Sequence, residues 1–158
     1  MAFTPRPAPA PAMLDDKDAL ALLRSPSLSA YPPQAIVKEL LVTARFGVIQ
    51  RAIALGLVSP YILLTDPGEP PGALVHGAAC FDAAVPLLRY LVFEQGVAPN
   101  HPDGYGTTPL DIVIETKSKR VALFFLRKVP FLRIHACGPR GLSPLMRAAR
   151  VGLEEVAA

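Results

Sequence analysis

The side chains of this chain that could do chemistry are two cysteines, three histidines and a few carboxylates. His76 and Cys80 are four residues apart, so a helix would place them on one face, as half of a zinc site. A closed zinc site needs two more ligands, and none stands at a compatible spacing. His135 and Cys137 form a weaker pair in a loop, and His101 follows in a turn. The sequence therefore predicts no metal and no other cofactor, and a structural hydrogen-bonding role for His76.

The residues support neither nucleophilic nor acid–base catalysis. Neither cysteine stands at a strand-to-helix elbow or beside an identifiable base. Ser143 occupies a helix-capping position, Asp103 opens a turn, and Asp111 lies near a helix N-terminus, where negative charge is favoured. Gly104 and Gly106 lack the lysine or third glycine of a phosphate-binding loop. We therefore predict that the chain is not an enzyme.

The stretch 103–111 shows what these residues do instead. Its two glycines within four residues favour a tight turn. Thr108 can cap a helix, and Pro109 suits the first helical position, where its missing N–H is no loss. Leu110 and the apolar residues after it supply a buried face. Such a unit cannot bury that face alone, so we expect it to recur.

The pattern does recur, at steps of 35 residues. Ser143 takes the place of Thr108 (143 − 108 = 35), and segment 73–79 keeps part of the pattern one step earlier. One further step aligns Ala44 with Ala79. Equal spacing of this kind is the sequence signature of a repeat protein.

On these strings the chain resembles the ankyrin-repeat family. DGYGTTPLD, GPRGLSPLMRAARVG, ALVHGAAC and GVAPN match the family's turn, Thr-Pro-Leu string, paired alanines and closing glycine, with Asp111 at the family's His position. The resemblance covers about residues 36–158 and implies an all-α solenoid of helix–turn–helix units with β-turn fingers. The implied units are about 34–66, 67–101, 102–136 and 137–158, the last incomplete. We expect residues 1–33 to form a Pro-rich arm, disordered over 1–13, with a short helix from Asp15 to Arg24.

Local signals predict where the helices lie. We expect helix from Gln34 until Gly47 breaks it, and a loop from Ser59 to Gly72, because prolines are frequent there. The other expected helices are Val48–Leu55, Leu74–Cys80, Val85–Glu94, Pro109–Glu115, Lys119–Lys128 and one beginning at Ser143–Pro144.

Charge and composition limit the kinds of partner and the cellular compartment that we expect. The segment 117–150 contains nine lysines and arginines and no acid. A solvated face is the simplest interpretation of this run, and attraction to an acidic partner is the alternative. The longest apolar stretch, 46–64, is interrupted, and prolines fill the N-terminus, so we expect neither a membrane span nor a signal peptide. Few cysteines favour a reducing compartment, cytoplasmic or nuclear.

The resemblance implies a non-catalytic scaffold that binds another protein, with an acidic surface as one option. Binding of nucleic acid or another anionic surface through 117–150 is the alternative function. Tyr105 is the best single candidate, because an exposed Tyr offers a large contact area at low entropic cost. Phe46 and Phe81 have core packing as an equal alternative. The family pattern carries partner binding to finger positions Gly104, Tyr105, Thr107, Pro139, Arg140 and Leu142, and to inner-helix positions Arg45, Phe46, Cys80, Phe81, Glu115, Thr116, Arg150 and Val151.

The last unit carries one further expectation. Only about a turn and a half of its second helix remains, so nothing would cover Leu145, Val151 and Val156. We expect the chain either to be part of a longer array or to self-associate through this end.

Overall fold

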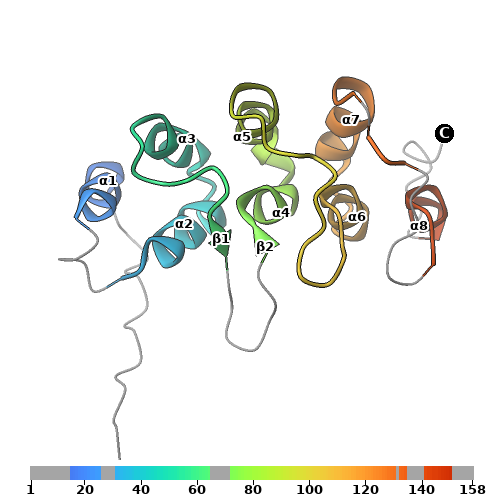
Figure 1. Ribbon diagram of the computed structural model, residues 1–158, viewed down its shortest axis with the longest axis horizontal. Coiled ribbons are helices and arrows are strands. Elements are labelled where there is room, and N and C mark those ends of the chain that lie inside the picture. The colour runs from blue at the N-terminus through green and yellow to red at the C-terminus, as the bar shows by residue number, and fades with distance from the viewer. Residues whose placement is uncertain (1–14, 26–30, 65–71, 131, 135–140, 151–158) are drawn as a thin grey trace, which may run out of the picture.

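The computed structural model describes residues 15–25, 31–64, 72–130, 132–134 and 141–150. The described residues are mostly helical, and their two strands hold two residues each. The protein is thus of the all-α class that the sequence predicts. The helices stand side by side along one long axis, from α1 at one end to α8 at the other (Figure 1).

Short helices pack across that axis in two rows. Helices α2 (Pro33–Val42), α4 (Leu74–Ala79), α6 (Pro109–Glu115) and α8 (Pro144–Arg150) form the lower row of Figure 1. Helices α3 (Phe46–Ala54), α5 (Val85–Arg89) and α7 (Lys119–Lys128) form the upper row. The 3₁₀ turn η1 (Asp82–Ala84) leads into α5, and the π-helical segment η2 (Tyr90–Glu94) continues it. Apart from α2 and α3, these bounds agree with the predicted ones within a residue.

Three lower-row helices begin at equal intervals. The first residues of α4, α6 and α8 are Leu74, Pro109 and Pro144, each 35 residues after the last (109 − 74 = 35; 144 − 109 = 35). The predicted 35-residue step is therefore present in the positions of these helices.

That step does not extend to the first helical pair, so the predicted alignment of Ala44 with Ala79 is wrong. Helices α2 and α6 are followed by turns of the same conformation, in which Ala44 and Lys117 have positive φ, 57° and 55° respectively. Arg45 N then donates to Leu40 O, and Ser118 N donates in the same way to Val113 O. Ala44 thus matches Lys117, 73 residues on (117 − 44 = 73), where two steps would give 70. Gly47 is likewise not the helix breaker, because it lies inside α3.

The segment 59–72 is not wholly a loop. Strands β1 (Leu63–Leu64) and β2 (Gly72–Ala73) pair antiparallel, with Leu63 opposite Ala73. Leu74 N donates to Ile62 O at 3.0 Å and extends the pairing into α4. The two strands lie beside α4, and β1 also contacts α2 (Figure 1).

A continuous apolar core runs between the two rows. Its largest fully buried side chains come from almost every helix and include Ile36, Leu40, Ile49, Leu74, Leu87, Leu91, Ile114 and Phe125. Helix α1 (Asp16–Arg24) joins this core through Ala19 and Leu23, and Asp15 caps it by accepting from Asp16 N at 2.7 Å. No helix in the described ranges has the length and apolarity needed to cross a membrane.

Candidate functional site

The turn before α6 is a closed loop built around one carboxylate. Asp103 Oδ1 accepts hydrogen bonds from Tyr105 N and Thr107 N, both at 2.9 Å. Asp103 N in turn donates to Thr107 O at 2.9 Å, and Gly106 takes φ +76°, which a side chain would disfavour. The loop holds the Tyr105 backbone in place while its side chain remains 56% exposed.

The same turn delivers the chain into α6 with both ends of a capping box satisfied. Thr108 Oγ1 accepts from Asp111 N at 3.3 Å, and Asp111 Oδ2 accepts from Thr108 N at 3.1 Å. Ser143 Oγ caps α8 in the same manner by accepting from Met146 N at 3.3 Å. The predicted capping roles of Thr108 and Ser143 are confirmed.

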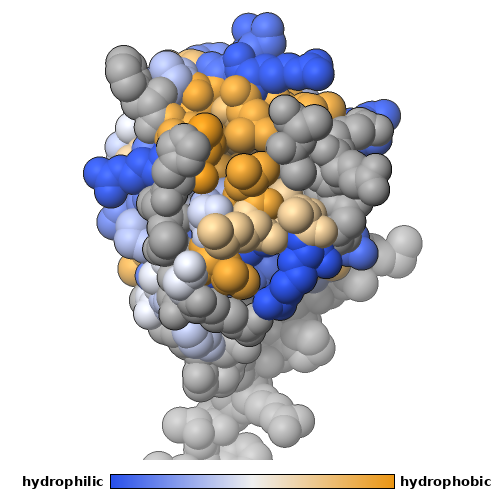
Figure 2. Space-filling model, turned by 90° about the vertical axis from the view of Figure 1, so that its right-hand side faces the viewer, coloured by the Kyte–Doolittle hydropathy of each residue, from blue (hydrophilic) through white to orange (hydrophobic). Residues whose placement is uncertain are grey.

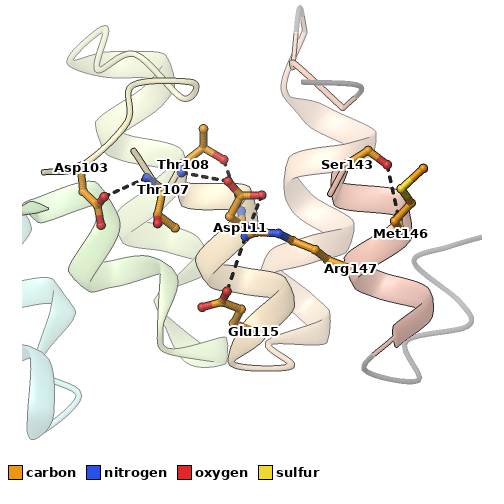
Figure 3. A network of polar contacts seen from close by, with 8 residues as sticks. All are labelled: Asp103, Thr107, Thr108, Asp111, Glu115, Ser143, Met146 and Arg147. Atoms are coloured by element: carbon orange, nitrogen blue, oxygen red, sulfur yellow. Dashed lines mark hydrogen bonds and ion pairs between the residues drawn. The ribbon is translucent and has the colours of Figure 1, made fainter. Parts of the chain in front are cut away.

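Asp111 has a second partner in the next helical unit. Arg147 reaches from α8 so that its Nη1 lies 3.4 Å from Asp111 Oδ1 and 3.5 Å from Glu115 Oε1 (Figure 3). The Arg147 and Asp111 side chains are only 7% and 3% exposed, whereas that of Glu115 is 55% exposed. A buried guanidinium thus joins α8 to α6, and water screens only the Glu115 arm.

One unit earlier, the junction between α4 and the next turn uses a histidine. His76 Nδ1 accepts from Ala73 N at 3.2 Å, which fixes the proton on Nε2, and Nε2–H donates to His101 O at 2.8 Å. Burial lowers the pKa of His76 below its ordinary value, because the charged ring would lose its solvation. The neutral ring therefore fits both contacts, and the predicted hydrogen-bonding role of His76 is confirmed.

The structure spreads the predicted finger residues between exposed and partly buried positions. Gly104 and Tyr105 are exposed, and Thr107 and Leu142 are half-buried. The interpretation of Tyr105 as an exposed turn residue is thus confirmed, and its role toward a partner stays a prediction. Pro139, Arg140 and Val151 lie outside the described residues, as do His135, Cys137 and the arm 1–14.

The inner-helix candidates are mostly engaged within the chain. Arg45 lies in the turn after α2, where its Nε donates to Asp16 Oδ1 at 2.8 Å and ties α1 down. Phe46 is buried at the start of α3, and its ring centroid lies 6.1 Å from that of Phe81. Core packing between units therefore accounts for both aromatic rings.

The remaining inner-helix candidates lie at or near helix C-termini. Thr116 Oγ1 donates to Ile112 O at 2.9 Å, Glu115 contacts Arg147, and Arg150 is exposed. Cys80 Sγ is 3.7 Å from His76 O, and burial raises the pKa of its thiol. A protonated thiol is a poor nucleophile, so the environment of Cys80 does not activate it.

The sequence missed the structural role of Arg147. It stands in the basic run 117–150, for which a solvated face or an acidic partner surface was expected, yet it is buried and paired. Arg120 is 80% exposed, but its charge is partly offset by Asp82, whose Oδ2 lies 3.9 Å from Arg120 Nε. The uninterrupted run in the sequence is therefore not an uninterrupted basic surface.

The α8 end of the molecule exposes apolar side chains. Leu145 and Met146 are 52% and 58% exposed, and apolar surface lies at the middle of this end face with charged side chains around it (Figure 2). The expected exposure of Leu145 is confirmed. Val151 and Val156 fall outside the described residues.

Among the described residues, no three of the types His, Cys, Asp and Glu gather closely enough to hold a metal ion. No family model matches the chain. The chain is 33% identical over 110 residues to human neurogenic locus notch homolog protein 4, which carries ankyrin repeats. The match covers 65% of this chain but 5% of that protein, so the chain spans about a twentieth of its length. This similarity agrees with the resemblance drawn from the repeated strings.

Proposed function

We propose that this chain is an ankyrin-repeat interaction module that binds a partner protein through its turns and lower-row helices. The observation that carries the proposal is Tyr105, a large side chain left 56% exposed on a turn whose backbone is fixed by Asp103. A rigid turn with an exposed Tyr loses little entropy when it binds, so contact area converts efficiently into affinity.

Three features support the ankyrin assignment. The lower-row helices α4, α6 and α8 begin 35 residues apart. His76 Nε2–H bonds to His101 O, next to the turn that opens the following unit. A segment of a notch homologue that carries such repeats is similar in sequence. Repeats of this kind stack into extended surfaces suited to protein partners.

Nucleic acid is the weaker candidate partner. Affinity for phosphates needs several free cations along one track. Here Arg147 is buried and Arg120 faces Asp82, which interrupts the basic run.

Site-specific photo-crosslinking in cells would test the proposal. A benzoylphenylalanine at position 105 should capture a defined protein, whereas the same group at Leu55, also exposed but at the end of α3, should not. The Tyr105→Ser variant should lose that protein in co-purification and keep the thermal stability of the native chain. Equal capture from positions 105 and 55 would contradict the proposal.

A further inference from the structure

A groove of about 980 Å³ lies between the upper-row elements α5–η2 and α7. These elements form the side of the molecule opposite the turn before α6 (Figure 1). The apolar part of its lining is Val85, Pro86, Leu123, Phe93 and Phe124. Phe93 stands edge-on to Phe124, with ring centroids 6.1 Å apart, and is 48% exposed. Phe124 is only 8% exposed, so Phe93 is the aromatic ring of this groove that faces solvent.

The rim of the groove is predominantly basic. It holds Arg89, Arg120, Arg127 and Lys128 against Asp82 and Glu94. Asp82 is already used, because its Oδ1 accepts from Arg120 N at 2.6 Å and from Val121 N at 3.2 Å, and so caps α7. Its charge also faces Arg120.

The other cations of the rim are free of ion pairs within the described residues. Arg89, Arg127 and Lys128 are exposed and make no such pair there. Glu94 is the one acid of this rim left to oppose them. The rim thus carries an unbalanced positive charge beside the exposed ring of Phe93.

The π-helical turn η2 forms part of this wall. Gln95 N bonds to Tyr90 O, five residues back, and Phe93 belongs to this widened turn. Single π-helical turns are rare in proteins and frequently lie at functional sites. This irregular turn is a second, independent indication that the groove is a functional site.

We propose that the groove binds an acidic peptide segment of a partner protein, with an apolar side chain of that segment packed against Phe93 and Leu123. The basic rim complements acidic side chains, and the apolar floor gives such a segment a non-polar anchor. A nucleic acid would meet the carboxylate of Glu94 at the rim. The turn that carries Tyr105 lies on the opposite side of the molecule (Figure 1), so this binding is separate from the function proposed above.

The test uses the whole chain and fluorescein-labelled peptides of about 12 residues, followed by fluorescence anisotropy. One peptide carries four Glu and two Leu; a second has the Leu changed to Ser; a third has the Glu changed to Lys. The first peptide should bind most tightly, and its affinity should fall by about tenfold in Arg127→Glu, since that charge then repels the peptide. Arg51→Glu is the matched control, because Arg51 also lies exposed in the last turn of an upper-row helix, α3.

Three further measurements keep the proposal open to refutation. Arg89→Glu should weaken the first peptide as Arg127→Glu does, and thermal melts should show that both variants fold. NMR shifts on binding should fall on Phe93 and Leu123. The proposal is overturned if the Ser peptide binds as tightly as the Leu peptide, or if Arg51→Glu weakens binding as much as Arg127→Glu. It is also overturned if the NMR shifts fall on Tyr105. Tighter binding of a labelled single-stranded oligonucleotide that displaces the peptide would overturn it as well.

Discussion

Two junctions of this molecule, α4 with α6 and α6 with α8, solve one packing problem with different chemistry. In both, the third residue of the earlier helix accepts a hydrogen bond from the N–H of the residue that precedes the helix. His76 does so in α4 and Asp111 does so in α6, 35 residues later. The two side chains differ in what their remaining polar atom can do.

A neutral histidine still has a donor, while a carboxylate has only acceptors. His76 Nε2–H therefore reaches the His101 carbonyl, a backbone group that any residue could supply. Asp111 Oδ1 is buried without a hydrogen-bond partner, and the positive charge of Arg147 Nη1, 3.4 Å away in the next unit, compensates its charge. The first junction is thus neutral and depends on one side chain, and the second is ionic and depends on two.

The largest effect is expected from Arg147→Met. Removing the guanidinium leaves Asp111 buried and unpaired, which typically costs about 3–5 kcal/mol. Because α8 contacts α6 at the end of the row, the loss should appear first as faster amide exchange in residues 144–150. Exchange in α4 should change little.

The matched control is Arg150→Met, an exposed position on the same helix. The double variant Asp111→Asn with Arg147→Met should recover part of the lost protection, since no buried charge remains. If Arg150→Met exposes α8 as strongly as Arg147→Met, the ionic junction is not what holds the helix.

A substitution in the neutral junction is expected to lower the free energy of unfolding by less. His76→Ala leaves the Ala73 N–H and the His101 carbonyl without their partner, and a buried group left unpaired costs about 1–3 kcal/mol. Chemical denaturation should report the change in the free energy of unfolding. His101→Ala is the control, because the acceptor is a backbone carbonyl that the substitution keeps.

The neutral junction should respond to mild acid. Burial lowers the pKa of His76 from 6.5, so below that value the unfolded chain takes up a proton that the folded chain refuses. The free energy of unfolding should therefore fall as the pH drops from about 6.5 toward the lower folded pKa, and be level above it. His76→Ala should flatten this slope, and His101→Ala should keep it. An unchanged slope in His76→Ala would assign the effect to another group.

Local signals explain what the sequence predicted well. The bounds of α6 and α7 and the caps Thr108 and Ser143 follow from side chains that act within one turn of themselves. The predicted end of α2 was wrong for a related reason. A glycine usually takes the positive-φ position after a helix, and here Ala44 takes it three residues before Gly47. The hairpin of β1 and β2 was missed because its pairing joins residues across 65–71, beyond any local pattern.

The ionic junction had no signal in the sequence that spacing rules could detect. Asp111 and Arg147 are 36 residues apart (147 − 111 = 36), and each has a sufficient local explanation, one as a capping residue and the other as part of a basic run. Their pairing follows only when α8 is stacked on α6. The 35-residue step predicts that stacking, but not which side chains it brings together.

The smallest effect is expected at Glu115, the outer arm of the same junction. Glu115→Gln keeps the shape of the side chain and removes the charge that faces Arg147 Nη1 at 3.5 Å. Because Glu115 is 55% exposed, water and salt screen that contact, and such pairs contribute about 0–1 kcal/mol. Amide exchange in residues 144–150 should therefore rise slightly at low ionic strength and match the native chain in about 0.5 M salt. Asp111→Asn, by contrast, should keep its effect in salt, since its contact is buried. A salt-independent loss in Glu115→Gln as large as that in Asp111→Asn would mean that Arg147 is held by both carboxylates equally, and the distinction between the buried and exposed arms would fail.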